Sequence, residues 1–142
     1  MKPTYYTPAY SENYEQAYWV YYHLTPELIN GTQTRTDDYR ADPLVSTGSA
    51  SLTDYSGSGY DRGLLCPAAD MSLNKTSMSE TFYLSNMSPQ LHSFNAGIWE
   101  VLENRVRKWV SEYGDLYVCV GGVLNEKLGT VGANKVTIPK SF

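Results

Sequence analysis

The hydrophobic and polar positions of the chain predict four strands and one long helix. Residues 17–24 (AYWVYYHL) are aromatic and β-branched and lie between polar turn residues, which indicates a strand. Residues 81–86 (TFYLSN), 116–120 (LYVCV) and 135–139 (KVTIP) favour three further strands. Residues 30–59 are rich in Gly, Ser, Thr and Asp and have little apolar periodicity, so we expect a long surface connection, which in compact domains is often functional.

The helix is predicted between Ser93 and Gly114. Apolar residues recur there at steps of three and four, which is typical of a helix that packs one stripe against a core. The stripe consists of Phe94, Ile98, Val101, Leu102, Val106, Trp109 and Tyr113. We expect Ser93 to cap the helix and Gly114 to end it. Strands and one long helix together predict a mixed α and β protein.

The polar face of this helix carries a candidate site. Asn95, Glu103 and Arg107 are eight and four residues apart, so they lie along one side. Asn95 falls in the first turn, where helix amides attract phosphate, and its amide oxygen suits a hard divalent cation that keeps most of its waters. Glu103 could hold one such water, and Arg107 could bind a phosphate with two hydrogen bonds. The alternative is a solvated face with a Glu103–Arg107 surface pair.

Composition narrows the class of protein. The 142 residues, 42% of them hydrophobic and 18% charged, fit one soluble globular domain with a substantial core. The net charge of −4 argues against an extended basic coat for nucleic acid but permits a local basic cleft. No apolar run is long enough to cross a membrane, and we expect no membrane partner.

The segment YDRGLLCPAADM, residues 60–71, raises the question of chemistry. Its Asp-Arg-Gly portion suggests a turn that handles a charged ligand. Chemistry at such a turn needs a proton-transfer group beside it, and Leu64 cannot move a proton. The segment is therefore either an active site that has lost its base or a site that never had one.

Three segments, YDRGLLCPAADM, TFYLSNMSPQ and SFNAGIWEVLENRVRKW, resemble in this order the DNA/RNA non-specific endonuclease family of secreted bacterial nucleases and mitochondrial endonuclease G. In that family the first motif reads Asp-Arg-Gly-His, with histidine as general base, and the second reads Asn-x-x-Pro-Gln. The third is a helix that opens with a metal-binding asparagine and continues with Glu and Arg. The resemblance runs from about Trp19 to the end of the chain, and three motifs in register make it specific.

The resemblance implies an α+β fold, with a ββα-metal nuclease core on a mixed, mainly antiparallel sheet and one long helix. It implies that Asn95 is the direct ligand of Mg²⁺, with Mn²⁺ as an alternative, and that Glu103 holds a metal-bound water. It also implies DNA and RNA as partners, bound without sequence preference.

Further positions follow from the same resemblance. Arg62 and Arg107 match arginines near the scissile phosphate, and Arg35 matches a further phosphate-contacting arginine in a loop that aligns less securely. Asn86 matches a polar neighbour of the site. The resemblance also assigns a turn that presents the base, shaped by Asp61 and Gly63.

Leu64 stands where the family has its histidine. Loss of a general base costs on the order of 10²–10⁴ in rate, whereas metal binding should survive. We expect His23 to be structural and His92 to be an exposed loop residue. Two functions follow: an Mg²⁺-dependent endonuclease for DNA and RNA that is impaired by Leu64, or a pseudo-nuclease that only binds metal and nucleic acid.

Cysteines and termini leave alternatives open. Cys66 and Cys119 are too far apart for a CxxC metal site, and the sequence permits either a disulfide or two buried free thiols.

The start of the chain has no signal-peptide pattern, so the protein is either cytosolic or, as the family implies, secreted or periplasmic with its leader removed. Family members continue beyond Phe142, so residues 1–142 are expected to form one domain, either compact or truncated. An exposed edge strand in a truncated chain would favour a homodimer.

Overall fold

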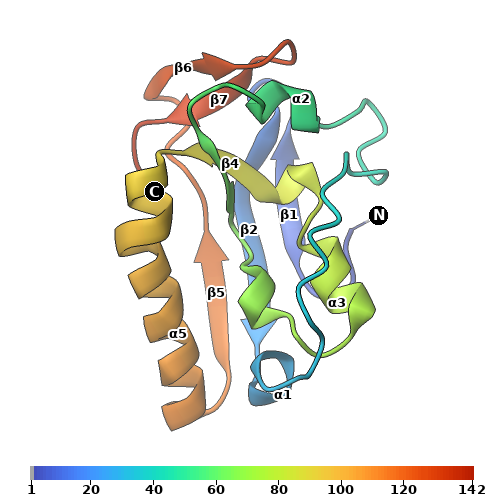
Figure 1. Cartoon of the computed structure of the whole chain (residues 1–142), viewed down its shortest axis with the longest axis vertical. Coiled ribbons are helices and arrows are strands. Elements are labelled where there is room, and N and C mark those ends of the chain that lie inside the picture. The colour runs from blue at the N-terminus through green and yellow to red at the C-terminus, as the bar shows by residue number, and fades with distance from the viewer. Residues whose placement is uncertain (1) are drawn as a thin grey trace.

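The computed structural model describes residues 2–142 and contains three antiparallel sheets (Figure 1). The largest has the strand order β1-β2-β5, formed by β1 (Thr7–Ser11), β2 (Gln16–Leu24) and β5 (Leu116–Val120). β2 pairs with both neighbours, and its alternating burial places Val20, Tyr22 and Leu24 on the inner face. The strands predicted over residues 17–24 and 116–120 are confirmed.

Two further strand pairs complete the sheets. β3 (Asp61–Leu64) pairs with β4 (Met87–Gln90), and β6 (Lys127–Val131) pairs with β7 (Val136–Pro139). The strand predicted over residues 135–139 is thus confirmed as β7. Figure 1 shows β6 and β7 at one end of the molecule, beside α2 (Leu52–Tyr55), which interrupts the long connection.

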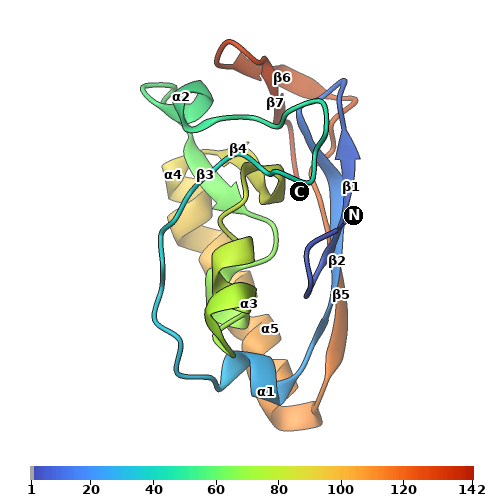
Figure 2. The same cartoon turned by 90° about the vertical axis from the view of Figure 1, so that its right-hand side faces the viewer.

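Short helices connect the strands, and all lie on one side of the large sheet. They are α1 (Pro26–Ile29), η1 (Ala68–Asp70), α3 (Lys75–Glu80) and η2 (Leu84–Asn86). In Figure 2 the strands β1, β2 and β5 form a single layer, with α1, α3 and α5 on the same side of it. No described element covers the opposite face, where Trp19, Tyr21 and Tyr117 are exposed.

The long helix begins at His92 and ends at Tyr113. It comprises α4 (His92–Phe94), the segment η3 (Asn95–Trp99), which is kinked at Gly97, and α5 (Glu100–Tyr113). Leu91 occupies the N-cap position, so the expected cap at Ser93 is wrong. Gly114 ends the helix as predicted, with a φ of 95° that favours glycine.

The apolar stripe of this helix does not face the core, contrary to its prediction. Ile98 is 65% exposed and Tyr113 77% exposed, and Val101, Leu102 and Trp109 are exposed as well. Only the narrow seam of Val106 and Val110 packs against the sheet. The side of the helix that carries Arg107 instead faces inward, where Arg107 pairs with a buried carboxylate.

Two local predictions are also wrong. Residues 81–86 form a turn and the short helix η2, because the amide of Leu84 donates to Arg40 O and that of Asn86 to Tyr83 O. The Asp-Arg-Gly segment is not a turn: Asp61 pairs with Gln90 within a regular antiparallel ladder. The ladder is favoured because β4 directly follows η2 and supplies a partner strand.

Both cysteines are free, so the disulfide alternative is wrong, and the alternative of two buried thiols holds for only one of them. Cys66 is fully buried in the core between the sheet and α5, whereas Cys119 is exposed. Cys119 pairs with Tyr21, which is exposed on the outer face of the sheet. Because side chains alternate along β5, Cys119 points away from Cys66, and no disulfide forms.

No helix among residues 2–142 is long and apolar enough to cross a membrane.

Candidate active site

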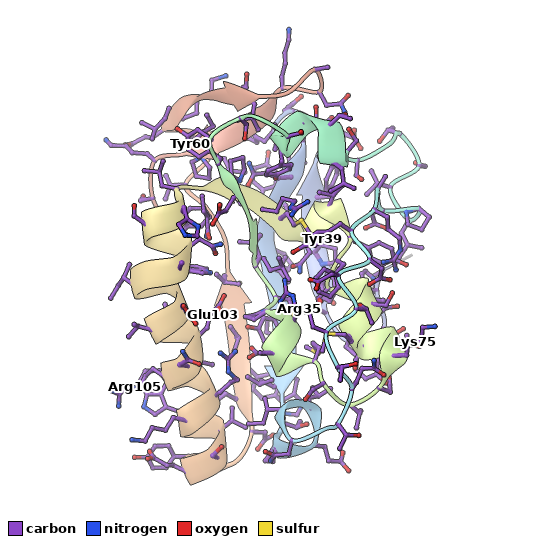
Figure 3. The ribbon with its side chains drawn as sticks, viewed as in Figure 1. Arg35, Tyr39, Tyr60, Lys75, Glu103 and Arg105 are labelled. Carbon is purple, nitrogen blue, oxygen red and sulfur yellow. The ribbon has the colours of Figure 1, made fainter. Side chains whose placement is uncertain are left out.

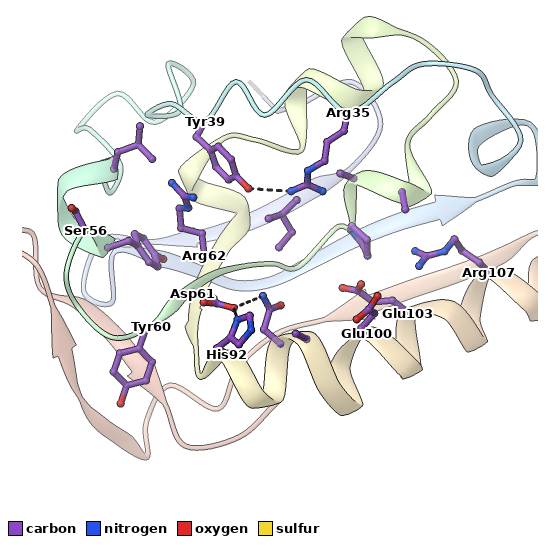
Figure 4. A pocket seen from close by; sticks show the side chains of 18 residues that line it. Arg35, Tyr39, Ser56, Tyr60, Asp61, Arg62, His92, Glu100, Glu103 and Arg107 are labelled. Carbon is purple, nitrogen blue, oxygen red and sulfur yellow. Dashed lines mark hydrogen bonds and ion pairs between the residues drawn. The ribbon is translucent and has the colours of Figure 1, made fainter.

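A cleft of about 900 Å³ opens between β3, the 35–39 loop and the long helix (Figure 4). The fold brings seven of the predicted site residues to its walls. They are Arg35, Asp61, Arg62, Leu64, Asn95, Glu103 and Arg107. These residues are separated by up to 72 positions in the sequence, so their convergence supports the interpretation of the three motifs as one site.

Asp61 joins the strand to the start of the helix. Its Oδ2 accepts hydrogen bonds from Asn95 Nδ2 at 3.0 Å and from His92 Nδ1 at 2.9 Å. Partial burial would raise the pKa of Asp61, but the bonds from Asn95 and His92 outweigh it and hold the pKa below its usual range. The amide nitrogen of Asn95 is thus bound, whereas its Oδ1 has no hydrogen-bond partner among residues 2–142 and can accept a cation or a hydrogen bond.

Asn95 stands at a kink in the long helix, because the backbone of Gly97 two residues later is not helical (φ −115°, ψ −114°). The kink is held by an aromatic cluster: Phe94, Trp99 and Phe142 have ring centroids 5.3–5.5 Å apart. Packing on both sides of Asn95 therefore fixes the start of the helix.

Acidic residues of α5 form one wall of the cleft. Burial raises the pKa of Glu103 to about 7, Arg107 partly opposes this rise, and Asp70 and Glu100 add to it. Figure 3 shows Glu103 on the inner side of the helix, with Arg105 pointing away from it. Glu100 was not among the residues predicted from the sequence, although its spacing of three residues from Glu103 places both on one helix face.

Arg107 is bound to a buried acid and not to Glu103. Its Nη1 donates to Asp70 Oδ1 at 2.7 Å, and its Nη2 donates to Asn104 at 2.8 Å. Asp70 is 1% exposed and also accepts from Tyr22. The Glu103–Arg107 surface pair is thus absent from the described residues. Nothing in the sequence marked Asp70 as the partner of Arg107.

The opposite wall carries two arginines arranged around Tyr39. The guanidinium of Arg62 lies 4.0 Å from the centroid of the Tyr39 ring. Arg35 donates from Nη2 to the Tyr39 hydroxyl at 3.0 Å, and its Nε contacts Asp37. Tyr39 was missed by the sequence reasoning, although it lies four residues after Arg35. This wall presents positive charge toward the acidic wall of α5 (Figure 4).

Two predicted residues lie behind the cleft. Asn86 is fully buried, with Oδ1 accepting from Cys66 N and Nδ2 donating to Cys66 O and Thr81 O, all at 2.9 Å. It therefore braces the segment that follows β3. Gly63 lies in β3, where a Cβ would stand 2.2 Å from Oε1 of Gln90, so this close packing requires glycine.

Leu64 lies at the border between the cleft and the core. It is 9% exposed, packs in an apolar cluster and also lines the cleft. No proton acceptor therefore stands at the end of β3. His92 does line the cleft, whereas His23 lies on β2 and contacts Asp115 and Tyr117.

The donors of the site suit a weakly coordinated cation. Residues 2–142 contain no group of three or more His, Cys, Asp or Glu side chains that could enclose a metal ion. Asn95 Oδ1 offers one neutral oxygen, with the carboxylates of Glu100 and Glu103 on the same wall. This arrangement fits Mg²⁺, which prefers oxygen ligands and keeps several of its waters.

An antiparallel strand pair followed by a helix, with a polar cleft between them, defines an α+β nuclease core, and a solved structure confirms this class. The crystal structure of the EndoG/EndoGI complex matches with a TM-score of 0.89 and 32% identity, over 98% of this chain and 63% of that one. The chain belongs to the DNA/RNA non-specific endonuclease family, whose sequence model matches residues 1–142.

Relatives agree with this assignment. The chain is 35% identical to human mitochondrial endonuclease G over 149 residues, covering 96% of this chain and 50% of the relative. It is 36% identical to a nuclease of Nostoc sp. (strain PCC 7120 / SAG 25.82 / UTEX 2576) over 138 residues, covering 96% and 49%. It thus spans about half the length of these relatives. The family recognised from the three motifs is confirmed.

Proposed function

We propose that this chain is a metal-dependent phosphodiesterase that cleaves DNA and RNA without regard to sequence, and that Leu64 impairs it. One observation carries the proposal: Asn95, Arg62 and Arg35 line the same cleft, with Leu64 at its floor. The family and its nuclease relatives support hydrolysis of nucleic acid.

Each wall of the cleft has its own part in this function. Arg62 and Arg35 hold the phosphate and position the scissile bond, and they read no base. Asn95 Oδ1 would hold Mg²⁺ or Mn²⁺, and the carboxylate of Glu103 would accept a hydrogen bond from water beside that cation. When bound, the cation neutralises the charge that develops on the phosphate oxygens.

Arg107 has fewer N–H donors left for phosphate than the motif suggested. Two of its donors already bind Asp70 and Asn104. Arg107 also lines the cleft and has further N–H donors, which can bind a phosphate there. The main effect of Arg107 is to fix the angle of the helix that carries Asn95 and Glu103.

A second function is favoured by the position of Leu64. Its side chain is part of an apolar core cluster, so the chain gains packing energy from it. A pseudo-nuclease that binds metal and nucleic acid without cleaving them would gain stability from this residue and lose nothing.

Replacing Leu64 by histidine separates the two functions. For a phosphodiesterase, Leu64→His raises Mg²⁺-dependent cleavage of both DNA and RNA by at least about a hundredfold, the low end of general-base catalysis. The gain falls below about pH 6.5, as the imidazole becomes protonated. Leu64→Gln, similar in size but not basic, gives no such gain, and Asn95→Ala abolishes it. A folded Leu64→His variant that binds metal and stays inert would establish the pseudo-nuclease.

A further inference from the structure

We propose that His92 is the proton acceptor of this site in the chain as it stands, positioned by Asp61. The inference rests on the proposed phosphodiesterase function. It starts from the bond between His92 Nδ1 and Asp61 Oδ2, 2.9 Å long, at the mouth of the cleft (Figure 4). Sequence alone predicted an exposed loop residue, because the 31 positions between the two residues hide this contact.

The bond determines which nitrogen of His92 can accept a proton. The carboxylate of Asp61 offers only acceptors, so the proton of the neutral imidazole resides on Nδ1. The lone pair is then on Nε2, as required of a general base. A carboxylate that orients histidine in this way is the arrangement used by catalytic triads. Nε2 has no hydrogen-bond partner among residues 2–142, and the side chain is 81% exposed, so water reaches it freely.

The imidazole is also held close to the metal-binding amide. His92 and Asn95 donate to the same oxygen of Asp61, so their side chains are neighbours. His92 begins the helix immediately after β4, and the amide of Asn95 donates to Leu91 O at 2.9 Å. The backbone that carries His92 is therefore helical and fixed, which gives the base a defined position relative to Asn95.

The step that His92 performs is the activation of water. The water oxygen forms a bond to phosphorus while the bond from phosphorus to the leaving sugar oxygen breaks. His92 Nε2 takes one proton from the attacking water and later returns it to solvent. The leaving oxygen takes a proton from water, so a phosphate monoester and a free hydroxyl result.

His23 supplies a matched control within the same chain. Its Nε2 lies 2.5 Å from Asp115 Oδ2, so it too is a histidine paired with an aspartate. It is stacked on Tyr117 and does not line the cleft. A general effect of removing a His–Asp pair would appear at both histidines, whereas a catalytic effect would appear only at His92.

The test compares Mg²⁺-dependent cleavage of DNA by the full chain and its variants. His92→Ala lowers the rate by at least about a hundredfold, and His23→Ala leaves it unchanged. Free imidazole in the buffer restores part of the activity of His92→Ala, because at this exposed position it can bind Asp61 and accept the proton in place of the side chain. It does not rescue His92→Gln, whose amide can donate to Asp61 and so competes with the free base. Rescue by a free base is a response that a merely structural histidine would not show.

A second arm uses Leu64→His. With a base restored on β3, His92→Ala lowers the cleavage rate by a smaller factor than in the natural chain, because the site then contains a second base. The proposal is overturned if the natural chain cleaves and His92→Ala does not slow it, or if only Leu64→His variants cleave. In both cases the phosphodiesterase function stands. Absence of cleavage in every variant, Leu64→His included, would overturn both proposals.

Discussion

Arg107 Nη1 lies 2.7 Å from Oδ1 of Asp70, a carboxylate that is 1% exposed. Burial raises the pKa of Asp70, and the hydrogen bond from Arg107 opposes this rise. The pair connects the long helix to the segment that follows β3, and Tyr22 anchors the same acid to the large sheet. Three structural elements thus meet at one buried charge.

Removing the arginine should leave that charge unpaired. We expect Arg107→Met to lower the free energy of unfolding by about 3 kcal/mol, because a buried ion loses its partner. Arg105→Met, on the outer side of the same helix, should change it by less than about 0.5 kcal/mol. Urea unfolding monitored by circular dichroism measures both. Equal midpoints for the two variants would show that the pair contributes nothing.

The raised pKa of Glu103 predicts a pH-dependent stability. The ordinary pKa of glutamate is 4.5 and that of Glu103 in the fold is about 7. Between these values the folded chain keeps a proton that the unfolded chain has lost, so stability falls as pH rises from about 4.5 to about 7 and is level above. Glu103→Gln should remove this fall and stabilise the protein at pH 8 by on the order of 2–3 kcal/mol.

Unfolding at pH 4.5 and pH 8 without divalent metal measures the effect of Glu103→Gln. Glu112→Gln, on the exposed side of the helix, is the control and should shift both midpoints equally. A Glu103→Gln variant whose midpoints follow those of the natural chain at both pH values would contradict the burial of this carboxyl.

Metal binding should depend on a single amide. We expect Asn95→Ala to weaken Mg²⁺ or Mn²⁺ binding by at least about tenfold, because the site has one direct protein ligand and waters supply the rest. Asn125→Ala, in an exposed loop, should leave binding unchanged. Isothermal titration calorimetry distinguishes them. A crystal grown with metal that places the ion away from Asn95 would contradict this assignment.

Binding to nucleic acid should weaken steeply with salt. The side chain of Arg62 forms a cation–π contact with Tyr39 and makes no hydrogen bond among residues 2–142, so its donors remain for phosphate. Removing one phosphate contact lowers the slope of log K against log salt by about 1. Arg62→Ala should show this change and Arg105→Ala should not, in fluorescence anisotropy with oligonucleotides of unrelated sequence. Strong preference for one sequence at fixed ionic strength would count against phosphate recognition.

The two thiols should differ in reactivity. Cys119 is exposed and should react with a thiol reagent in the native protein, whereas Cys66 should react only after unfolding. Burial also raises the pKa of Cys66, which lowers the fraction of reactive thiolate. Counting the thiols modified before and after denaturation tests this. Cys119→Ser should remove the native reaction entirely.

The sequence by itself determined the features that depend on short-range pattern. The strand over residues 17–24 and the end of the helix at Gly114 follow from side-chain shape and backbone preference, which act within a few residues. The three motifs identified the family because their residue types and order are themselves sequence properties. The absence of a histidine at position 64 was equally plain.

Only the tertiary structure decided which groups meet. The pairs Asp70–Arg107 and Asp61–His92 join residues 37 and 31 positions apart, so neither could be predicted from local spacing. Periodicity showed that α5 is amphipathic. Only the structure shows that the face carrying Arg107 turns inward, where this arginine pairs with the carboxylate of Asp70. An apolar stripe stabilises a helix wherever a surface covers it, whereas a buried charge must find its counter-ion within the fold. That asymmetry turned Arg107 inward and left Ile98 and Tyr113 in solvent.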